Sequence, residues 1–461
     1  MKATDPEIGL LCRSLIALPS VTGDGTRRIA EFCASEILAP RGIEARLVAS
    51  PEEGSEQVNL IAFIAGTNRA ATPLLLNTHL DTVPPGDPML WTECDGKPFE
   101  ASIKGDHIYG LGAADTKLDF LAKALALTQC VRPGRDVWLV GSFGEEHGLA
   151  GARELAASDM LPRGAIAMVG EPSHLKVITG HKGLMVFELT IRFSPSRTDG
   201  EFDVCRIVFS GKAAHSSTPA LGENAIAKAL AAIGSQAKSN VVSINGGDAV
   251  NKVPARCEIV VAADTAKAID DSAIQGIDGR AAYVIPGVAI EMLARFVDAV
   301  SEFANAVGPT QTDYVAPTLT SNLGMVRTRD DAMVLEFELR PPPSLALGVV
   351  RDGVAGIVQQ LADGFPALSL KLIEKRANPG FRSSAGNEAV ELAMVALVRA
   401  QLPLETGVKT GCTEAGIYAA VGLHPIVFGP GPSAGVIHAP NEYNLLSEVE
   451  AAIRFYRALL D

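Results

Sequence analysis

The sequence predicts an α/β fold, with a mixed, largely parallel sheet between helices, that is interrupted by an inserted α+β domain. Helical and strand-like patterns alternate over the first part of the chain. The middle changes to strand-like runs in which apolar and polar residues alternate, and the tail from about residue 378 returns to the first rhythm. We therefore expect one domain from 1–181 and 376–461, and a second domain inserted as 182–375.

The first part carries short apolar runs bounded by turn residues, which are typical of buried strands. The expected strands are 58–65, 73–78, 136–143 and 164–170. The expected helices, from the spacing of apolar residues, are 7–18, 26–39 and 117–130. Buried strands that alternate with helices indicate parallel pairing, because a parallel connection needs a long crossover.

In the middle, strands with one apolar and one polar face indicate an antiparallel sheet with helices on one face. The expected strands are 183–193, 203–210, 240–245, 256–262, 318–325, 333–340 and 367–374. The expected helices are 222–236, 286–306 and 345–361. The order of these expected strands and helices is compatible with a middle domain made of two similar strand–helix–strand halves. The tail is expected to end in a helix at 446–460.

Composition excludes several classes of protein. Of 461 residues, 47% are hydrophobic and 20% charged, which excludes a disordered or fibrous chain. Acidic residues outnumber basic ones by 53 to 40 and no basic cluster stands out, which argues against nucleic acid and anionic membranes as partners. Seven scattered cysteines without a C-x-x-C pair, and a start without a signal-peptide core, predict a cytoplasmic protein.

Several potential metal ligands follow expected strands or Gly-rich loops. They are His79 with Asp81, the pair Glu145 and Glu146, Glu171, Asp115, and His438. The first three groups follow the strands 73–78, 136–143 and 164–170. Since ligands bind at the carboxyl ends of parallel strands, we expect these side chains to converge.

Each candidate also has a plain structural interpretation. A His-x-Asp is more often a surface pair, and a Glu-Glu pair is more often a solvated loop. Asp115 could cap the helix after it, and Glu171 could cap a helix that starts at Pro172. His438 could be a buried, hydrogen-bonded histidine. Five such candidates, three of them at expected strand ends, favour a shared metal site.

The ligand types indicate the metal. Two histidines and three carboxylates without a thiolate suit zinc, and cobalt or manganese are also compatible. A bridging carboxylate can hold two ions about 3.5–4 Å apart with a water between them. One acid must stay off the metal to take the proton of that water.

Seven motifs, in this order along the chain, resemble a known family. They are NTHLDTVPPGD (77–87), YGLGAADTK (109–117), GEEHGLAGA (144–152), VGEPSHL (169–175), GKAAHSSTPALGENA (211–225), GGDAVNKVP (246–254) and FGPGPSAGVIHAPNEY (428–443). The sequence is similar to the dinuclear zinc aminoacylase and carboxypeptidase family, which contains acetylornithine deacetylase, succinyl-diaminopimelate desuccinylase and glutamate carboxypeptidase. The resemblance implies a zinc-peptidase-like catalytic domain with a ferredoxin-like lid domain.

The resemblance also implies a role for each candidate and two zinc ions per subunit. One ion would be held by His79, Asp115 and Glu171, and the other by Asp115, Glu146 and His438. Glu145 would be the general base and later the proton donor to the leaving amine. Asp81 would hydrogen-bond His79 and fix its tautomer.

In the inserted domain, the resemblance implies that His215 steadies the oxyanion and that Asn251 faces the substrate. Arg340 is a candidate for gripping a substrate carboxylate, and a surface arginine at a strand end is an equal alternative. Where many relatives have Asp-Ala-Arg, this chain has Cys412-Thr413-Glu414-Ala415, so the arginine of the desuccinylases is absent. The insert is long for a deacetylase and resembles the double-sized lid of bacterial dipeptidases, whereas Glu171 is typical of deacylases.

We therefore expect a zinc-dependent amide hydrolase that deacylates a small N-acyl amino acid and acts as a monomer or homodimer. A dipeptidase or carboxypeptidase of the same family is the alternative. A non-catalytic, metal-holding binding protein is an alternative of another class, and it would be expected to lack the base or a ligand. A serine-hydrolase elbow at 431–435 is disfavoured, because no helix is expected directly after it.

Overall fold

The computed structural model describes residues 6–52, 54–234, 240–270 and 274–461. The chain forms two compact units. The first unit comprises residues 1–181 and 381–461, and the inserted unit comprises residues 182–380. In the described ranges no helix is long and apolar enough to cross a lipid bilayer.

The first unit is built on a nine-stranded mixed sheet, in the order β1-β2-β6-β3-β7-β19-β8-β17, with β18 also paired to β8. Its strands are β1 (Ala45–Ala49), β2 (Val58–Ile64), β3 (Leu74–His79), β6 (Val137–Ser142), β7 (Ile166–Gly170), β8 (Val177–His181), β17 (Phe381–Arg382), β18 (Thr406–Lys409) and β19 (His424–Phe428). The four central strands are parallel, as predicted, and the flanking pairs β1·β2, β2·β6, β19·β8 and β8·β17 are antiparallel.

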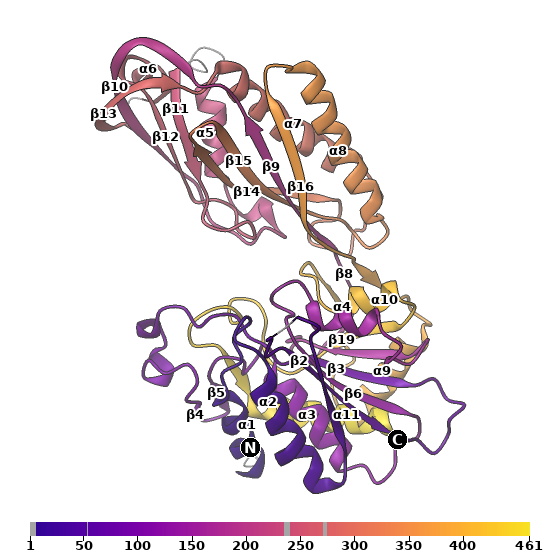
Figure 1. Ribbon diagram of the computed structural model, residues 1–461. Helices are drawn as coiled ribbons and strands as arrows, with labels where there is room; N and C mark the ends of the chain where they lie inside the picture. Colours follow the sequence, from indigo (N-terminus) through magenta and orange to yellow (C-terminus); the bar gives the residue numbers. More distant parts are fainter. Residues whose placement is uncertain (1–5, 53, 235–239, 271–273) are drawn as a thin grey trace. The chain divides into compact units, whose positions relative to one another are not determined.

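Helices cover both faces of this sheet (Figure 1). One face carries α1 (Pro6–Ile16), α2 (Arg27–Phe32), α3 (Lys117–Thr128), α9 (Glu388–Arg399) and α11 (Leu446–Leu460). The other face carries α4 (Ala150–Ala156) and α10 (Ala415–Ala420). Helix α3 is apolar almost all round and packs against both β3 and α11, so it is buried along its whole length.

Parallel register brings the strand ends to one edge of the sheet. His79, the last residue of β3, pairs with Ser142, the last residue of β6. Gly170, the last residue of β7, pairs with Thr78 on one side and with Phe428 on the other. The loops after β6, β7 and β19 therefore leave the sheet beside His79. A small sheet lies elsewhere in the unit, formed by β4 (Ser102–Lys104), β5 (His107–Tyr109) and β20 (Tyr443–Leu445).

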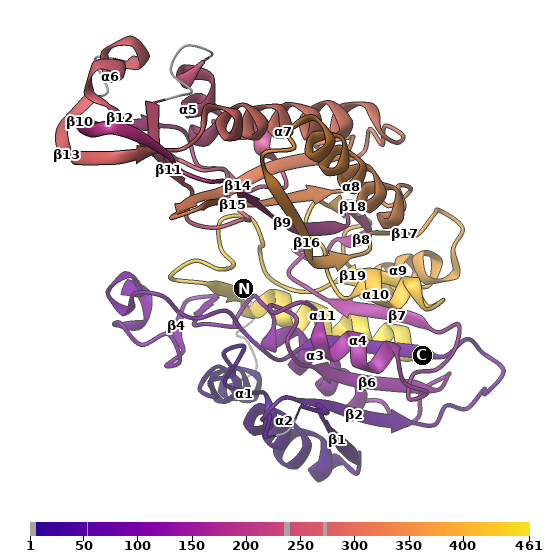
Figure 2. The ribbon, with the colours of Figure 1, turned by 45° about the horizontal axis from the view of Figure 1, so that its top comes forward.

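The inserted unit is one antiparallel sheet of eight strands, in the order β13-β10-β12-β11-β14-β15-β9-β16. Its strands are β9 (Leu184–Arg192), β10 (Ser196–Ser210), β11 (Val241–Gly246), β12 (Arg256–Ala262), β13 (Ile274–Val284), β14 (Thr320–Arg329), β15 (Ala332–Arg340) and β16 (Ser369–Asn378). Its helices are α5 (Ala225–Ile233), α6 (Ala263–Asp270), α7 (Gly287–Ala306) and α8 (Leu347–Gly364). Figure 2 shows α7 and α8 side by side over one face of the sheet, as predicted.

The unit consists of two halves with the same strand and helix order. The first half runs β10-α5-β11-β12-α6-β13, and the second runs β9-α7-β14-β15-α8-β16. In each half the strand that is third in sequence lies between the first and second, as in a ferredoxin-like sheet. The halves join through their equivalent edge strands, β11 and β14. The first half is thus inserted into the second half, between strand β9 and helix α7.

The structure differs from the predicted elements in a few places. Helix α6 and strand β13 were not predicted, because the apolar residues of ADTAKAID are mostly alanines and IQGIDGRAAYV is interrupted by two glycines. Strand β10 begins at Ser196, earlier than the predicted 203–210, because its polar first half pairs with β13. The predicted helix 222–236 appears as α5, and its last two residues lie outside the described part of the chain.

Candidate metal centre

His79 lies at the end of β3 and is 1% exposed. Its Nε2 atom lies 3.1 Å from Oδ1 of Asp115 and 4.0 Å from Oε1 of Glu171. Its Nδ1 atom donates to the main-chain carbonyl of Asp81 at 3.0 Å, and the Asp81 carboxylate lies farther away, at 3.6 Å. The Nδ1 hydrogen bond leaves Nε2 as the ligand atom, facing the two carboxylates.

Asp115 lies in the Gly-rich loop before α3, and both of its oxygens face histidines. Oδ1 faces His79, and Oδ2 lies 3.1 Å from Nε2 of His438. The main-chain amides of Ala114 and Asp115 donate to one buried carboxylate oxygen of Glu442, at 2.8 and 3.0 Å. Asp115 does not cap α3, because the N-cap residue is Thr116 and no side chain makes a cap hydrogen bond. The loop therefore presents Asp115 between the two imidazoles.

His438 and Glu146 form the second side of the cluster. Nε2 of His438 lies 2.9 Å from Oε1 of Glu146, and one ligand atom from each of Asp115, Glu146 and His438 lies within 4.8 Å of the others. The His438 side chain is 44% exposed, so it is not a buried core histidine. Burial lowers its pKa, but hydrogen bonds to Asp115 and Glu146 outweigh this effect and raise the pKa to about 11.

Glu171 follows β7 directly, and no helix starts at Pro172. Burial raises the pKa of Glu171 to about 7, against the opposing charge of Lys409. Nζ of Lys409, at the end of β18, lies 3.3 Å from Oε2 of Glu171 and 3.3 Å from the carbonyl of Pro172. One oxygen of Glu171 thus faces His79, and the other is held by a lysine.

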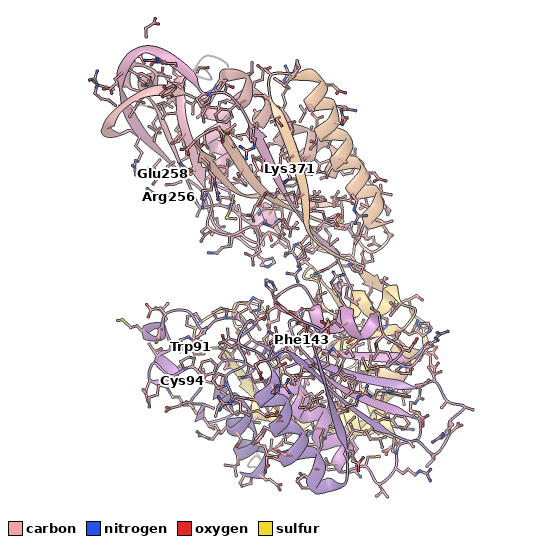
Figure 3. The ribbon with its side chains drawn as sticks, in the orientation of Figure 1. Trp91, Cys94, Phe143, Arg256, Glu258 and Lys371 are labelled. Carbon is pink, nitrogen blue, oxygen red and sulfur yellow. The ribbon has the colours of Figure 1, made fainter. Side chains whose placement is uncertain are left out.

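Glu145 lies in the loop after β6, and its side chain is buried. Phe143, labelled in Figure 3, precedes this loop, and its main-chain carbonyl accepts from the amide of Gly151 at 2.8 Å. Burial, followed by the negative charge of Glu146, raises the pKa of Glu145 well above its ordinary value. A carboxylate with a raised pKa beside a ligand cluster suits a general base.

A buried polar network lies beneath the cluster. Asp119 on α3 accepts from Thr78 at 2.6 Å and pairs with Lys123 at 2.7 Å, and Tyr456 donates to its other oxygen. Nζ of Lys123 also donates to the carbonyl of Asn77 at 2.6 Å. This network connects the last residues of β3, just before His79, to α3 and α11.

The donor set suits divalent metal ions. The two oxygens of Asp115 face different histidines, and each histidine has its own further carboxylate, Glu171 or Glu146. Asp115 therefore lies between two groups of potential ligands. Imidazole and carboxylate donors without thiolate suit zinc.

Three predicted residues lie in the inserted unit, and one loop links them there. Nδ1 of His215 lies 2.6 Å from Oγ of Ser217. The amide of Ser216 donates to the carbonyl of Asn251 at 3.1 Å, and Oγ of Ser216 accepts from Arg340 at 3.3 Å. Arg340 is buried and not a surface residue, and its guanidinium pairs with Glu338 at 2.7 Å.

Two residues of the first unit that contact the cluster were not predicted as site residues. Glu442 lies within the motif around His438, but its neighbours in sequence gave no reason to single it out. Lys409 comes just before the Cys412 segment, on a four-residue strand with no apolar pattern. No local sequence pattern indicates either residue, because each contacts a partner that lies more than two hundred residues away in the sequence.

Comparisons with known proteins identify the family. The model of peptidase family M20/M25/M40 matches residues 75–461. Acetylornithine deacetylase of Edwardsiella ictaluri is 30% identical over 277 residues, covering 55% of this chain and 66% of the relative. The Photorhabdus laumondii enzyme of the same name is 31% identical over 276 residues, covering 54% and 65%. The chain thus spans about two thirds of the length of these relatives.

Solved structures share the fold. Aminoacylhistidine dipeptidase from Vibrio alginolyticus has a TM-score of 0.70 at 17% identity, covering 99% of this chain and 97% of the other. An M20 family metallo-carboxypeptidase from Sulfolobus solfataricus has a TM-score of 0.63 at 17% identity, covering 99% of both chains. The family model covers most of the chain, including every candidate ligand. The chain therefore belongs to peptidase family M20/M25/M40.

Proposed function

We propose that this protein is a two-zinc amide hydrolase that removes the acyl group from a small N-acyl amino acid. The observation that carries the proposal is the bridging position of Asp115 between His79 and His438, with Glu145 next to the cluster. Asp115 would be shared by both ions. His79 and Glu171 would complete one site, and Glu146 and His438 the other.

When bound, the zinc ions would act as Lewis acids and lower the pKa of water. Glu145 takes a proton from the attacking water, whose oxygen forms the new bond to the carbonyl carbon. The C–N bond then breaks, and Glu145 gives the proton to the departing nitrogen. His215 would donate to the oxyanion, with Asn251 and Arg340 as substrate-binding residues. The Glu338 carboxylate and Ser216 hydroxyl would hold the Arg340 guanidinium in one orientation.

The curated relatives that we compared are named acetylornithine deacetylase, which favours an N-acyl amino acid as substrate. A dipeptidase is the second candidate, and the doubled inserted unit favours it. The dipeptidase from Vibrio alginolyticus aligns over nearly the whole of this chain, including the doubled unit. Both candidates cleave an amide whose nitrogen belongs to an amino acid with a free carboxylate. They differ in the group on the carbonyl side of the amide, which is a simple acyl group in one and an aminoacyl group in the other.

The test is a hydrolysis screen of N-acetyl amino acids against unblocked dipeptides, using protein loaded with zinc. We expect turnover of N-acetyl amino acids at the higher kcat/KM. A clear preference for dipeptides would support the second candidate. Turnover of neither class, in protein that holds two zinc ions, would contradict both.

A further inference from the structure

Asp81 is fully buried, and its carboxylate contacts the loop that carries the base. Oδ1 accepts from the main-chain amide of Glu145 at 3.1 Å, and Oδ2 accepts from the amide of Glu146 at 3.2 Å. Both oxygens of the carboxylate are therefore engaged by two consecutive peptide groups. Hydrogen bonds from backbone amides to an ionised carboxylate are among the stronger hydrogen bonds in proteins.

The contact between Asp81 and His79 has a different character. Nδ1 of His79 donates to the main-chain carbonyl of Asp81 at 3.0 Å, whereas the nearer carboxylate oxygen is 3.6 Å away. A distance of 3.6 Å is too long for a hydrogen bond. The shorter contact to His79 therefore comes from a main-chain group that any residue at position 81 would supply, and the Asp81 carboxylate adds a longer electrostatic contact.

We propose that the Asp81 side chain is a positioning residue for Glu145 and Glu146, and not chiefly for His79. A single carboxylate holds the peptide groups of both residues, so it fixes the base and its neighbouring ligand relative to each other. Without these two hydrogen bonds, the loop would become more mobile and both Glu145 and Glu146 would shift relative to the other ligands. The inference rests on the proposed roles of Glu145 and Glu146, but the contact itself can be tested in metal-free protein.

The first test measures amide hydrogen exchange at single-residue resolution in the metal-free protein. Asp81→Asn keeps the shape but replaces one acceptor oxygen with an NH₂ group, which cannot accept from an amide. We expect exchange at Glu145 or Glu146 to become about tenfold faster or more. Ser20→Ala is the matched control, because Ser20 donates to the carbonyl of Leu80 at 2.7 Å on the same segment without contacting the loop. It should leave these two amides unchanged.

The second test separates the two roles by zinc affinity. In a His79→Ala background the second site keeps its full set of proposed ligands, Asp115, Glu146 and His438. Without the His79 imidazole, Asp81→Asn can act on that site only through the loop. Loss of an outer-shell partner typically weakens metal binding about 10–100-fold, and we expect a loss of this size here. In a His438→Ala background, where His79 and Glu171 remain, the same substitution should have little effect.

Two results would overturn the proposal. One is unchanged exchange at both loop amides in Asp81→Asn. The other is a loss of zinc affinity in the His438→Ala background that equals or exceeds the loss in the His79→Ala background. If Asp81→Asn does not fold, His79→Ala alone provides the second test. This variant keeps the Asp81 carboxylate, so both loop amides should stay protected from exchange. Absence of zinc binding in every background would contradict the proposed function, while the exchange result would still decide the role of Asp81.

Discussion

Glu145 and Glu146 are neighbours in sequence with different surroundings. Glu146 lies 2.9 Å from His438, within the ligand cluster. Glu145 is buried, and the charge of Glu146 helps raise its pKa well above the ordinary value. Burial raises the pKa of Glu146 too, but its hydrogen bond with His438 opposes that rise. Surroundings that act differently on two nearby acids are a usual way in which a site divides the work between them. These surroundings support our proposal that Glu146 is the metal ligand and that Glu145 accepts the proton.

Glu145→Gln tests this division. The amide keeps a similar shape but cannot take a proton from water, so kcat should fall about 10²–10⁴-fold. Zinc content, measured by elemental analysis, should stay near that of the wild type. Glu146→Gln is the matched comparison and should lose zinc. If Glu145→Gln loses zinc and Glu146→Gln keeps it, the two roles are reversed.

The sequence was informative where a candidate ligand or base follows a strong strand signal. His79, Glu145, Glu146 and Glu171 all come directly after apolar runs, and parallel register then brings them together. Glu442, by contrast, reaches Asp115 only through a fold that no local pattern encodes. Contacts of this kind depend on tertiary packing, so they could not be predicted from the sequence.

Strand β7 approaches α3 so closely that its last position has no room for a side chain. A Cβ atom on Gly170 would lie 1.9 Å from a carboxylate oxygen of Asp119 and 2.5 Å from Oγ1 of Thr78. Both atoms belong to the buried network below His79. The glycine is thus required by close approach, at the residue just before Glu171.

We expect Gly170→Ala to lower the free energy of unfolding by about 1–3 kcal/mol, the usual cost of overpacking a core. Because Glu171 is the next residue, zinc affinity should fall as well. Urea unfolding and zinc titration measure the two effects. Gly356→Ala, on α8 with open space around the added atom, is the control and should raise stability by about 0.5–1 kcal/mol. Wild-type stability in Gly170→Ala would contradict the close-approach argument.

The predicted elements were most accurate where apolar periodicity is strong. The segments predicted at 117–130 and 446–460 appear as α3 and α11, and the run 164–170 appears as β7. The pair α6 and β13 was missed, because its apolar residues are mostly small or separated by glycines and β13 is stabilised by pairing with β10. Strands at the edge of a sheet need a weaker apolar signal than central strands, since one side remains open to solvent.

The whole protein should hold close to two divalent ions per chain, because the cluster offers two sets of ligands around Asp115. Elemental analysis of purified protein measures this directly. Treatment with a chelator should remove the ions and the hydrolytic activity together, and added zinc should restore both. Activity that survives complete removal of the metal would contradict the proposed mechanism.

His215 lies in the first half of the inserted unit, in the loop between β10 and α5, and Arg340 ends β15 of the second half. Ser216 joins the two by accepting from Arg340. Because both halves belong to one chain, we expect His215 to act on the site of its own subunit. His215→Ala should lower kcat about 10²–10³-fold, the usual cost of an oxyanion donor, without loss of zinc.

Mixing subunits tests that expectation. Glu145→Gln and His215→Ala proteins are each expected to be nearly inactive, and mixing them under conditions of subunit exchange should restore no activity. Each variant mixed with wild-type protein controls for inhibition by the partner. Recovered activity in the mixture would show that His215 acts across subunits.

Strands β11 and β14 join the two halves of the inserted unit within one chain, so the two sides of this junction can carry different residues. In a pair of identical subunits, a residue at the shared axis occurs twice, so each substitution is made on both sides at once. Here Asn245 pairs with Arg327, and Gly246 pairs with Val326. The guanidinium of Arg327 donates to the carbonyls of Gly246 and Gly247. These pairs are not symmetric, because the residues on the two strands differ. Because the two halves lie on one chain as separate stretches of sequence, a substitution in one half leaves the other unchanged. One copy can keep the residues of the reaction while the other evolves new ones.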